Sequence, residues 1–156
     1  MTEASSHESI LIVEDNPDDA ELAVIALRQK GISLPYQIAR NGEEALDIAF
    51  RRKPLPDSRP IEPGLILLDL NLPDKNGIEV LKELRASPHT RYVPVVVLTT
   101  SMLEEDMIQS YENGANSFVR KPVDFSTFLH YIELICHYWL RANLRPAPAI
   151  SQKPSS

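Results

Sequence analysis

Carboxylate, hydroxyl and ammonium side chains stand directly after four segments of this sequence that are typical of buried β-strands. These side chains belong to Glu14 and Asp15, Asp69, Thr99 and Thr100, and Lys121. In an open parallel sheet, ligands bind beyond the carboxyl ends of the strands, so these groups would converge at one edge. Any one of them alone is more often a solvated charge, a helix cap or an ordinary strand residue. The joint pattern, with each group at the end of its own strand, favours a functional site.

The chemistry of such a site follows from its charges. Three clustered carboxylates repel one another, so one of them stays protonated or a cation joins them. A set of oxygen ligands without His or Cys suits Mg2+, for which Mn2+ can substitute, better than zinc or copper. A carboxylate beside Mg2+ and the ammonium of Lys121 can accept a phosphoryl group, because both cations would neutralise the incoming oxygens. The residues therefore indicate phosphoryl transfer onto a carboxylate.

The elements that would position these groups alternate along the chain. Short apolar runs predict strands at 10–13, 36–39, 65–68, 95–98 and 117–120. Helical spacing and caps predict helices from 17 to about 30, and over 43–50, 78–86, 103–113 and 125–142. Five strands alternating with five helices predict a single doubly wound α/β domain with a parallel sheet covered on both faces. We expect this domain to span residues 9–142, between a disordered arm (1–8) and a disordered Pro- and Ser-rich tail (143–156).

Composition excludes several other classes of protein. A chain of 156 residues suits one domain, and its net charge of −6 argues against a general nucleic-acid binder. The single cysteine, Cys136, rules out a disulfide framework and fits a buried structural thiol. We find no signal peptide and no apolar run long enough to span a membrane, so we expect a soluble, cytoplasmic protein. A long loop with four prolines covers residues 51–64, and no Gly-rich phosphate loop follows any strand.

The sequence resembles the receiver domain of two-component response regulators, the family of the bacterial chemotaxis regulator. The resemblance covers about residues 9–140 and is carried by Ile-Leu-Ile-Val-Glu-Asp-Asn (10–16), Leu-Ile-Leu-Leu-Asp-Leu-Asn-Leu-Pro-Asp-Lys-Asn-Gly (65–77), Val-Val-Val-Leu-Thr-Thr-Ser (95–101) and Gly-Ala-Asn-Ser-Phe-Val-Arg-Lys-Pro (114–122). It implies a flavodoxin-like sheet with strand order 2-1-3-4-5. It also implies a stand-alone phosphorelay signalling protein, not an enzyme, that is phosphorylated by a histidine kinase and signals by changing shape.

The resemblance further implies a role for each residue at the strand ends. Asp69 would be the phosphoacceptor, with Asp15 a direct ligand of Mg2+, Glu14 acting mainly through water, and the backbone carbonyl of Asn71 completing the protein ligands. Lys121 would pair with the phosphoryl group.

Two further roles concern the switch and the turn beside it. Thr99 would bind the phosphoryl group and, with Phe118, form the switch. The Lys121–Pro122 bond is expected to be cis, which would aim Lys121 into the site. Phe118 stands where the family often has Tyr, so any rotation would be driven by packing alone, and a plain core role for this residue remains open.

Other departures and alternatives concern the chemistry. The acidic pair is Glu-Asp instead of Asp-Asp, and Thr100 stands where a small Ala is frequent. In similar receivers the positions of Asn71 and Ser101 tune hydrolysis of the acyl phosphate.

A pseudo-receiver that binds proteins without phosphorylation is one alternative function. An aspartyl phosphatase is another, but Asn71 occupies the position where its general acid would be required.

Within the family, the chain most resembles the small regulators paired with cyanobacterial and bacterial phytochromes. The features are Glu-Asp-Asn-Pro-Asp-Asp (14–19), the insertion before the third strand, Leu-Thr-Thr-Ser (98–101) and Tyr-Trp-Leu (138–140).

The last predicted helix is apolar beyond the single stripe that would pack on the sheet, so it needs a second partner. We therefore expect a homodimer through the last helix and fifth strand, with Phe118, Tyr131, Leu134 and Tyr138 at its surface.

Overall fold

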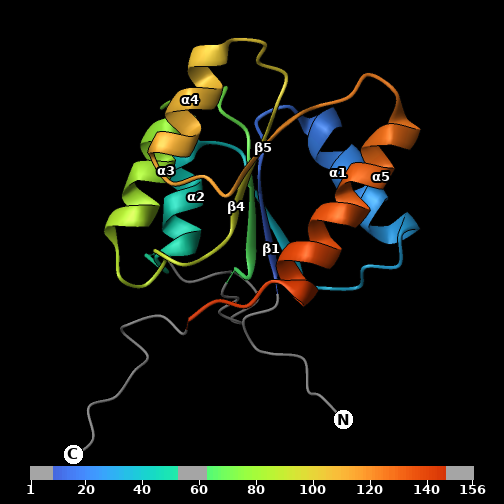
Figure 1. The fold of residues 1–156 in the computed structure, drawn as a ribbon, viewed down its shortest axis with the longest axis horizontal. Helices are drawn as coiled ribbons and strands as arrows, with labels where there is room; N and C mark the ends of the chain where they lie inside the picture. The colour runs from blue at the N-terminus through green and yellow to red at the C-terminus, as the bar shows by residue number, and fades with distance from the viewer. Residues whose placement is uncertain (1–8, 53–62, 147–156) are drawn as a thin grey trace, which may run out of the picture.

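The computed structural model describes residues 9–52 and 63–146, which form a parallel β-sheet between two layers of helices (Figure 1). The strands are β1 (Ile10–Val13), β2 (Tyr36–Ala39), β3 (Leu65–Leu68), β4 (Val95–Thr99) and β5 (Ser117–Arg120). They lie in the order β2-β1-β3-β4-β5. This arrangement confirms the predicted flavodoxin-like α/β fold.

Within the described residues, five helices cover the two faces of this sheet. They are α1 (Pro17–Gln29), α2 (Gly42–Ala49), α3 (Gly77–Ala86), α4 (Glu104–Glu112) and α5 (Phe125–His137). Helices α1 and α5 lie on one face and α2, α3 and α4 on the other (Figure 1). The last helix departs from prediction, because its α-helical part ends at His137 and a π-helical segment, η1 (Tyr138–Ala142), follows. There the N–H of Asn143 donates to the carbonyl of Tyr138, at the wider spacing of a π-turn.

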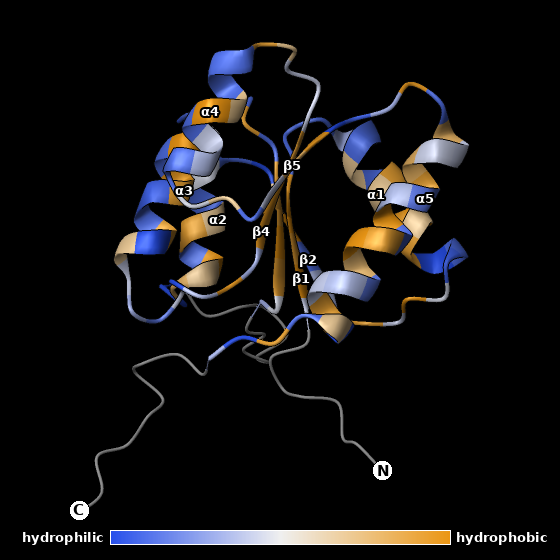
Figure 2. Ribbon diagram, viewed as in Figure 1, coloured by the Kyte–Doolittle hydropathy of each residue, from blue (hydrophilic) through white to orange (hydrophobic). Residues whose placement is uncertain are grey.

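The strands are buried because they carry apolar side chains on both sides, as Figure 2 shows by the hydrophobic colour of the sheet between the two helical layers. Alternate residues of β1 separate accordingly: Leu11 and Val13 join the core under α2 and α3, whereas Ile10 and Ile12 join the core under α1 and α5. The two cores fix the sheet, and with it the edge at which the candidate residues end.

Side-chain caps begin the helices just beyond that edge. The Asn16 carboxamide oxygen accepts hydrogen bonds from the backbone N–H groups of Asp18 and Asp19, at 2.8 and 3.2 Å, and Pro17 occupies the first helical turn. Asn76 and Glu79 form a reciprocal capping box at the start of α3. The chain therefore turns sharply from β1 into α1, whereas a loop over residues 69–76 separates β3 from the capped start of α3.

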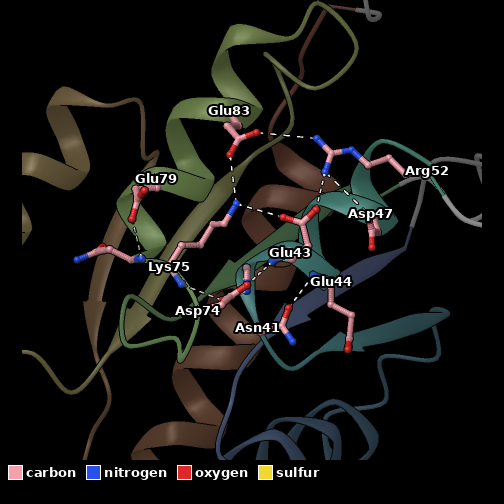
Figure 3. Close-up of polar contacts among 11 residues, drawn as sticks. Asn41, Glu43, Glu44, Asp47, Arg52, Asp74, Lys75, Glu79 and Glu83 are labelled. Carbon is pink, nitrogen blue, oxygen red and sulfur yellow. Dashed lines mark hydrogen bonds and ion pairs between the residues drawn. The ribbon is translucent and has the colours of Figure 1, made fainter.

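The loop after β3 is also tied to α2 (Figure 3). The Asp74 carboxylate accepts hydrogen bonds from the N–H groups of Gly42 (2.7 Å) and Glu43 (2.9 Å). Burial alone would raise the pKa of Asp74, but these N–H donors outweigh it and lower the pKa. Lys75 Nζ lies 3.3 Å from a Glu43 carboxylate oxygen and 3.6 Å from one of Glu83. These contacts hold the loop that follows Asp69.

Several predictions concern residues beyond the described part of the chain. The arm at 1–8, most of the proline-rich loop and residues 147–156 of the tail lie there. Residues 143–146 are described and belong to no helix or strand. Across the described residues, no helix combines the length and apolar character that a membrane span requires.

Candidate phosphoryl-acceptor site

Backbone pairing brings Glu14 and Asp69 together at the carboxyl edge of the sheet. Val13 lies opposite Leu68 in the parallel register of β1 and β3. The N–H of Asp69 donates to the carbonyl of Val13 at 3.0 Å, so the two acidic residues leave the sheet side by side. The third contributor comes from β5, where the N–H of Lys121 donates to the carbonyl of Thr99 at 2.8 Å. The predicted convergence of these strand ends is therefore present in the structure.

The Lys121 ammonium lies at the centre of this cluster. Its Nζ contacts Glu14 Oε1 at 2.5 Å, Asp19 Oδ2 at 3.1 Å and Asp69 Oδ2 at 3.2 Å. The side chains of Glu14 and Asp69 are each only 8% exposed, and that of Lys121 is 11% exposed. These charges are thus held largely out of water, where their mutual interactions are strong.

Burial and neighbouring charges shift the pKa values of Glu14 and Lys121. Burial raises the pKa of Glu14, and although the hydrogen bond from Lys121 opposes it, the pKa remains above its ordinary value. Burial alone would lower the pKa of Lys121, but the hydrogen bond to Glu14 and the charges of Asp69 and Glu14 raise it instead. Lys121 is therefore a firmly protonated cation, suited to pair with an anionic group.

The acidic residue next in sequence, Asp15, lies apart from these contacts. Asp15 is exposed, while the other Glu14 oxygen, Oε2, accepts the N–H of Asn16 at 3.1 Å. In residues 9–52 and 63–146, no three acidic, His or Cys side chains are grouped closely enough to hold a metal ion by themselves. Mg2+ usually takes one or two carboxylates and keeps several waters, so the site does not need such a group. Three carboxylates around one ammonium leave excess negative charge, and their oxygen-only chemistry fits a hard divalent cation.

The two threonines at the end of β4 differ in their exposure to solvent. Thr99 is fully buried, and its hydroxyl oxygen accepts the N–H of Ser101 at 3.3 Å. Thr100 is exposed and lines a cavity of about 270 Å3 whose polar wall includes Asp69 and Lys121. Thr99 thus ends β4 at the same edge as the carboxylates, although its hydroxyl is engaged within its own loop.

The loop after Asp69 approaches the site closely. The N–H of Asn71 donates to Asp69 Oδ1 at 3.2 Å, and the Asn71 residue is exposed. A Cβ atom at Gly77 would lie 2.6 Å from the carbonyl oxygen of Asp69 and 2.8 Å from the Cα of Leu70. Only glycine fits at this close approach of two backbone segments.

The prediction of a cis Lys121–Pro122 bond is wrong, since this peptide bond is trans. The trans form is favoured for X–Pro bonds by about 0.5–1 kcal/mol. In this form Lys121 Nζ already reaches the Asp69 carboxylate, so the orientation for which a cis bond was expected is achieved without it.

Phe118 lies on β5 opposite Val97, partly buried against the core under α2 and α3. It also lines an open groove of about 470 Å3 with Tyr131 and Leu134 of α5. Phe118 therefore contacts the core and also borders an open groove, while its place in a dimer surface stays a prediction. Tyr138, the fourth residue of the predicted dimer surface, is 52% exposed but does not line this groove.

Asp19 is the site residue that sequence reasoning missed. The sequence alone predicts no role at the site for Asp19, yet its carboxylate contacts Lys121. A signal was available: Asn16-Pro17 begins a helix directly after the strand that delivers Glu14, and Asp19 is the third residue of that helix. That position keeps its carboxylate at the edge of the sheet.

Comparisons with known proteins agree with this geometry. Residues 10–133 match the family model described as the response regulator receiver domain. The chain is 39% identical to a probable methanogenesis regulatory protein, FilR2, of Methanothrix harundinacea, over 96% of this chain and 94% of that protein. It is 37% identical to the response regulator Rcp1 of Synechocystis sp., over 93% of this chain and 97% of Rcp1.

Solved structures give the same result. The phosphorylated cyanobacterial phytochrome response regulator RcpA superposes with a TM-score of 0.81 at 35% identity, over 90% of this chain and 99% of RcpA. The Mn2+-bound form of Rcp1 superposes with a TM-score of 0.79 at 37% identity, over the same shares of the two chains. Fold, strand-end carboxylates and family match coincide, so this chain belongs to the response regulator receiver domain family and is a response regulator of phosphorelay signal transduction.

Proposed function

We propose that this protein accepts a phosphoryl group on Asp69 from a phytochrome-type histidine kinase, in a Mg2+-dependent reaction, and signals by a change of shape. The observation that carries the proposal is the contact of Lys121 Nζ with the buried carboxylates of Asp69 and Glu14. A reactive carboxylate beside a fixed cation is the arrangement that phosphoryl transfer needs, because positioning and charge neutralisation supply most of the catalysis.

In the proposed reaction, an Asp69 carboxylate oxygen forms a bond to phosphorus as the phosphorus–nitrogen bond of the donor phosphohistidine breaks. The electron pair of that bond stays on the imidazole nitrogen, which takes up a proton. Lys121 neutralises a phosphoryl oxygen, and the Thr99 hydroxyl, whose oxygen accepts the N–H of Ser101, turns its own hydrogen toward another phosphoryl oxygen. The Thr99 movement, with repacking of Phe118, is the proposed switch.

The proposed Mg2+ ligands are the carboxylates of Asp69 and Asp15, the backbone carbonyl of Asn71 and, through water, Glu14. When bound, the ion supplies positive charge to the phosphoryl oxygens, and Mn2+ can replace it. Support comes from the oxygen-only donor set, its excess negative charge and the Mn2+ bound in the related Rcp1. The protein residues bind the ion and orient the reacting carboxylate.

The decisive test is incubation with acetyl phosphate and Mg2+, followed by intact-protein mass spectrometry. We expect one phosphoryl adduct in the wild type, none in Asp69→Asn, and none after chelation of the metal. Absence of an adduct in folded wild-type protein would instead favour the pseudo-receiver. Repeated turnover of a phosphate monoester would contradict the proposal that the protein is a phosphoacceptor and not an enzyme.

The kinase assignment rests on relatives that are phytochrome response regulators, RcpA among them. The phosphotransfer profile against a panel of purified histidine kinases tests it. We expect transfer from phytochrome-type kinases to be faster than from the other kinases, and equal rates across the panel would refute the assignment. A phytochrome-type kinase partner and a single buried thiol agree with a cytoplasmic location and a reducing compartment, which we propose for this protein.

We also propose that the groove between β5 and α5 is the surface of a homodimer. Leu134 is 53% exposed and lines the groove with the partly buried Phe118 and Tyr131, and Tyr138, just after α5, is 52% exposed. Exposed apolar side chains gathered beside a groove favour a partner with the same apolar surface. Sedimentation equilibrium at tens of micromolar protein should show a dimer that Leu134→Glu dissociates. Leu144→Glu is the matched control, because Leu144 is 92% exposed and lies outside the groove. A monomeric wild type would refute the dimer.

A further inference from the structure

The Lys121 ammonium has no hydrogen-bond donor left for a new ligand. A lysine ammonium carries three N–H donors. In this structure its three acceptors are Glu14 Oε1, Asp19 Oδ2 and Asp69 Oδ2. A phosphoryl group on Asp69 brings up to two negative charges and three acceptor oxygens, so it can use more than the one donor that Asp69 now holds. A phosphoryl group that takes a second ammonium donor therefore displaces either Glu14 or Asp19.

The three acceptors differ in how readily they can give up the ammonium. Glu14 is 8% exposed, and its carboxylate would lose its cation in a largely dry environment, which is costly. Asp19 is 36% exposed and lies in the first turn of α1, where water and the positive end of the helix dipole stabilise a free carboxylate. Asp19 is therefore the contact that yields at the lowest cost.

We propose that Asp19 is a positioning residue that competes with the phosphoryl group for Lys121 and so restrains phosphorylation of Asp69. The inference rests on the proposed role of Asp69 as phosphoacceptor. Two physical effects act in the same direction. The Asp19 carboxylate occupies one ammonium N–H, and its charge repels the incoming phosphoryl oxygens. Removal of that charge should therefore favour the phosphorylated state.

The test compares Asp19→Asn with Asp18→Asn. Both variants remove one negative charge from the first turn of α1, but the Asp18 side chain is exposed and makes no contact with Lys121. With acetyl phosphate and Mg2+, we expect the initial rate of phosphorylation to rise about two- to five-fold in Asp19→Asn, the range of a partly exposed ion pair. We expect Asp18→Asn to stay within about 1.5-fold of wild type, since an exposed charge farther away is largely screened. Asp19→Glu, which keeps the charge, should return the rate toward that of wild type.

An equilibrium readout separates competition from altered folding. Beryllofluoride, an anionic mimic of the phosphoryl group, should bind Asp19→Asn about two- to five-fold more tightly than wild type in the presence of Mg2+. A merely structural role would weaken binding or leave it unchanged. Equal or slower phosphorylation of Asp19→Asn relative to Asp18→Asn, with unchanged beryllofluoride affinity, would overturn the inference. Failure of the wild type to gain a phosphoryl group that Asp69→Asn lacks would overturn the proposed function itself, which is a separate outcome.

Discussion

The Ser101 hydroxyl donates a hydrogen bond to Asp106 Oδ2 at 2.5 Å, which joins the loop after β4 to the first turn of α4. Ser101 also contacts β5, because Arg120 Nε donates to the Ser101 carbonyl at 3.2 Å. Its N–H donates to the Thr99 hydroxyl. Ser101 thus links the proposed phosphoryl-binding hydroxyl to both α4 and β5.

The first prediction concerns the lifetime of the acyl phosphate. The double variant Asn71→Met, Ser101→Leu should lose its phosphoryl group several-fold more slowly than wild type, because bulky apolar side chains restrict water at the two proposed flanks of the site. The decay of the adduct, followed by intact mass after removal of the phosphodonor, measures it. A decay rate equal to that of wild type would show that these two side chains do not control water access.

The second prediction concerns the close approach at Gly77. Gly77→Ala should be destabilising, since its Cβ would meet the Asp69 carbonyl and the Leu70 backbone, neither of which can move as a flexible side chain can. We expect a loss of about 1–3 kcal/mol, with weaker phosphorylation of the remaining folded protein. Urea unfolding measures the loss. Gly31→Ala is a useful control, because a Cβ there meets nothing within 4 Å and only the positive φ of 71° is strained.

The third prediction separates packing from assembly along α5. Ile132 is fully buried, so Ile132→Ala should lower the free energy of unfolding by about 2–5 kcal/mol. Leu134 is 53% exposed, and Leu134→Ala should change the stability of the monomer by less than about 0.5 kcal/mol. Denaturation at low protein concentration, where a dimer would dissociate, checks both values. Similar losses of unfolding free energy in the two variants would contradict the assignment of Ile132 to the core and of Leu134 to the exposed face of α5.

The fourth prediction concerns the stability of the fold at acidic pH. Hydrogen bonds from the Thr127 hydroxyl and N–H, and from the Ser126 hydroxyl, lower the pKa of Asp124 to about 2 from an ordinary 3.8. A carboxyl whose folded pKa is lowered stabilises the fold above its unfolded pKa, and this contribution is lost as the pH falls through the folded value. Asp124→Ala should therefore lower the melting temperature near neutral pH, and the difference from wild type should shrink between pH 3.8 and about 2. A difference that stays constant over this range would exclude the cap as its source.

The fifth prediction concerns the thiol. Cys136 is 1% exposed in the core under α1 and α5, and burial raises its pKa to about 12. It should resist alkylation at neutral pH and react only when the protein unfolds, because the thiolate is the reactive form. Mass-spectrometric alkylation with and without denaturant checks this. Rapid modification of the native protein would contradict a structural role for Cys136.

The sequence predicted the fold well because its signals are strong and local. Runs such as 10–13 and 65–68 are apolar on every residue, as strands covered on both faces require, so their carboxyl ends and the residues that follow could be located. The convergence of Glu14, Asp69 and Lys121 followed from that topology alone.

The details that the sequence did not predict depend on side-chain orientation and local geometry. Asp19 reaches Lys121 only because α1 turns at Asn16, and no periodic pattern reports on that angle. The exposure of Asp15 beside the buried Glu14 could not be read from an acidic pair. The trans Lys121–Pro122 bond follows the ordinary preference of X–Pro bonds and not the form that the resemblance implied. The π-helical turn after His137 interrupts a helix whose apolar spacing gives no sign of the change.

The ion pair between Lys121 and Glu14 joins residues 107 positions apart, from the first strand and from just beyond the last. During synthesis, a chain that still lacks its fifth strand would hold Glu14 and Asp69 without the ammonium of Lys121 beside them. The charged cluster can therefore assemble only when the domain is complete, because its cation is supplied by almost the last part of the fold to leave the ribosome.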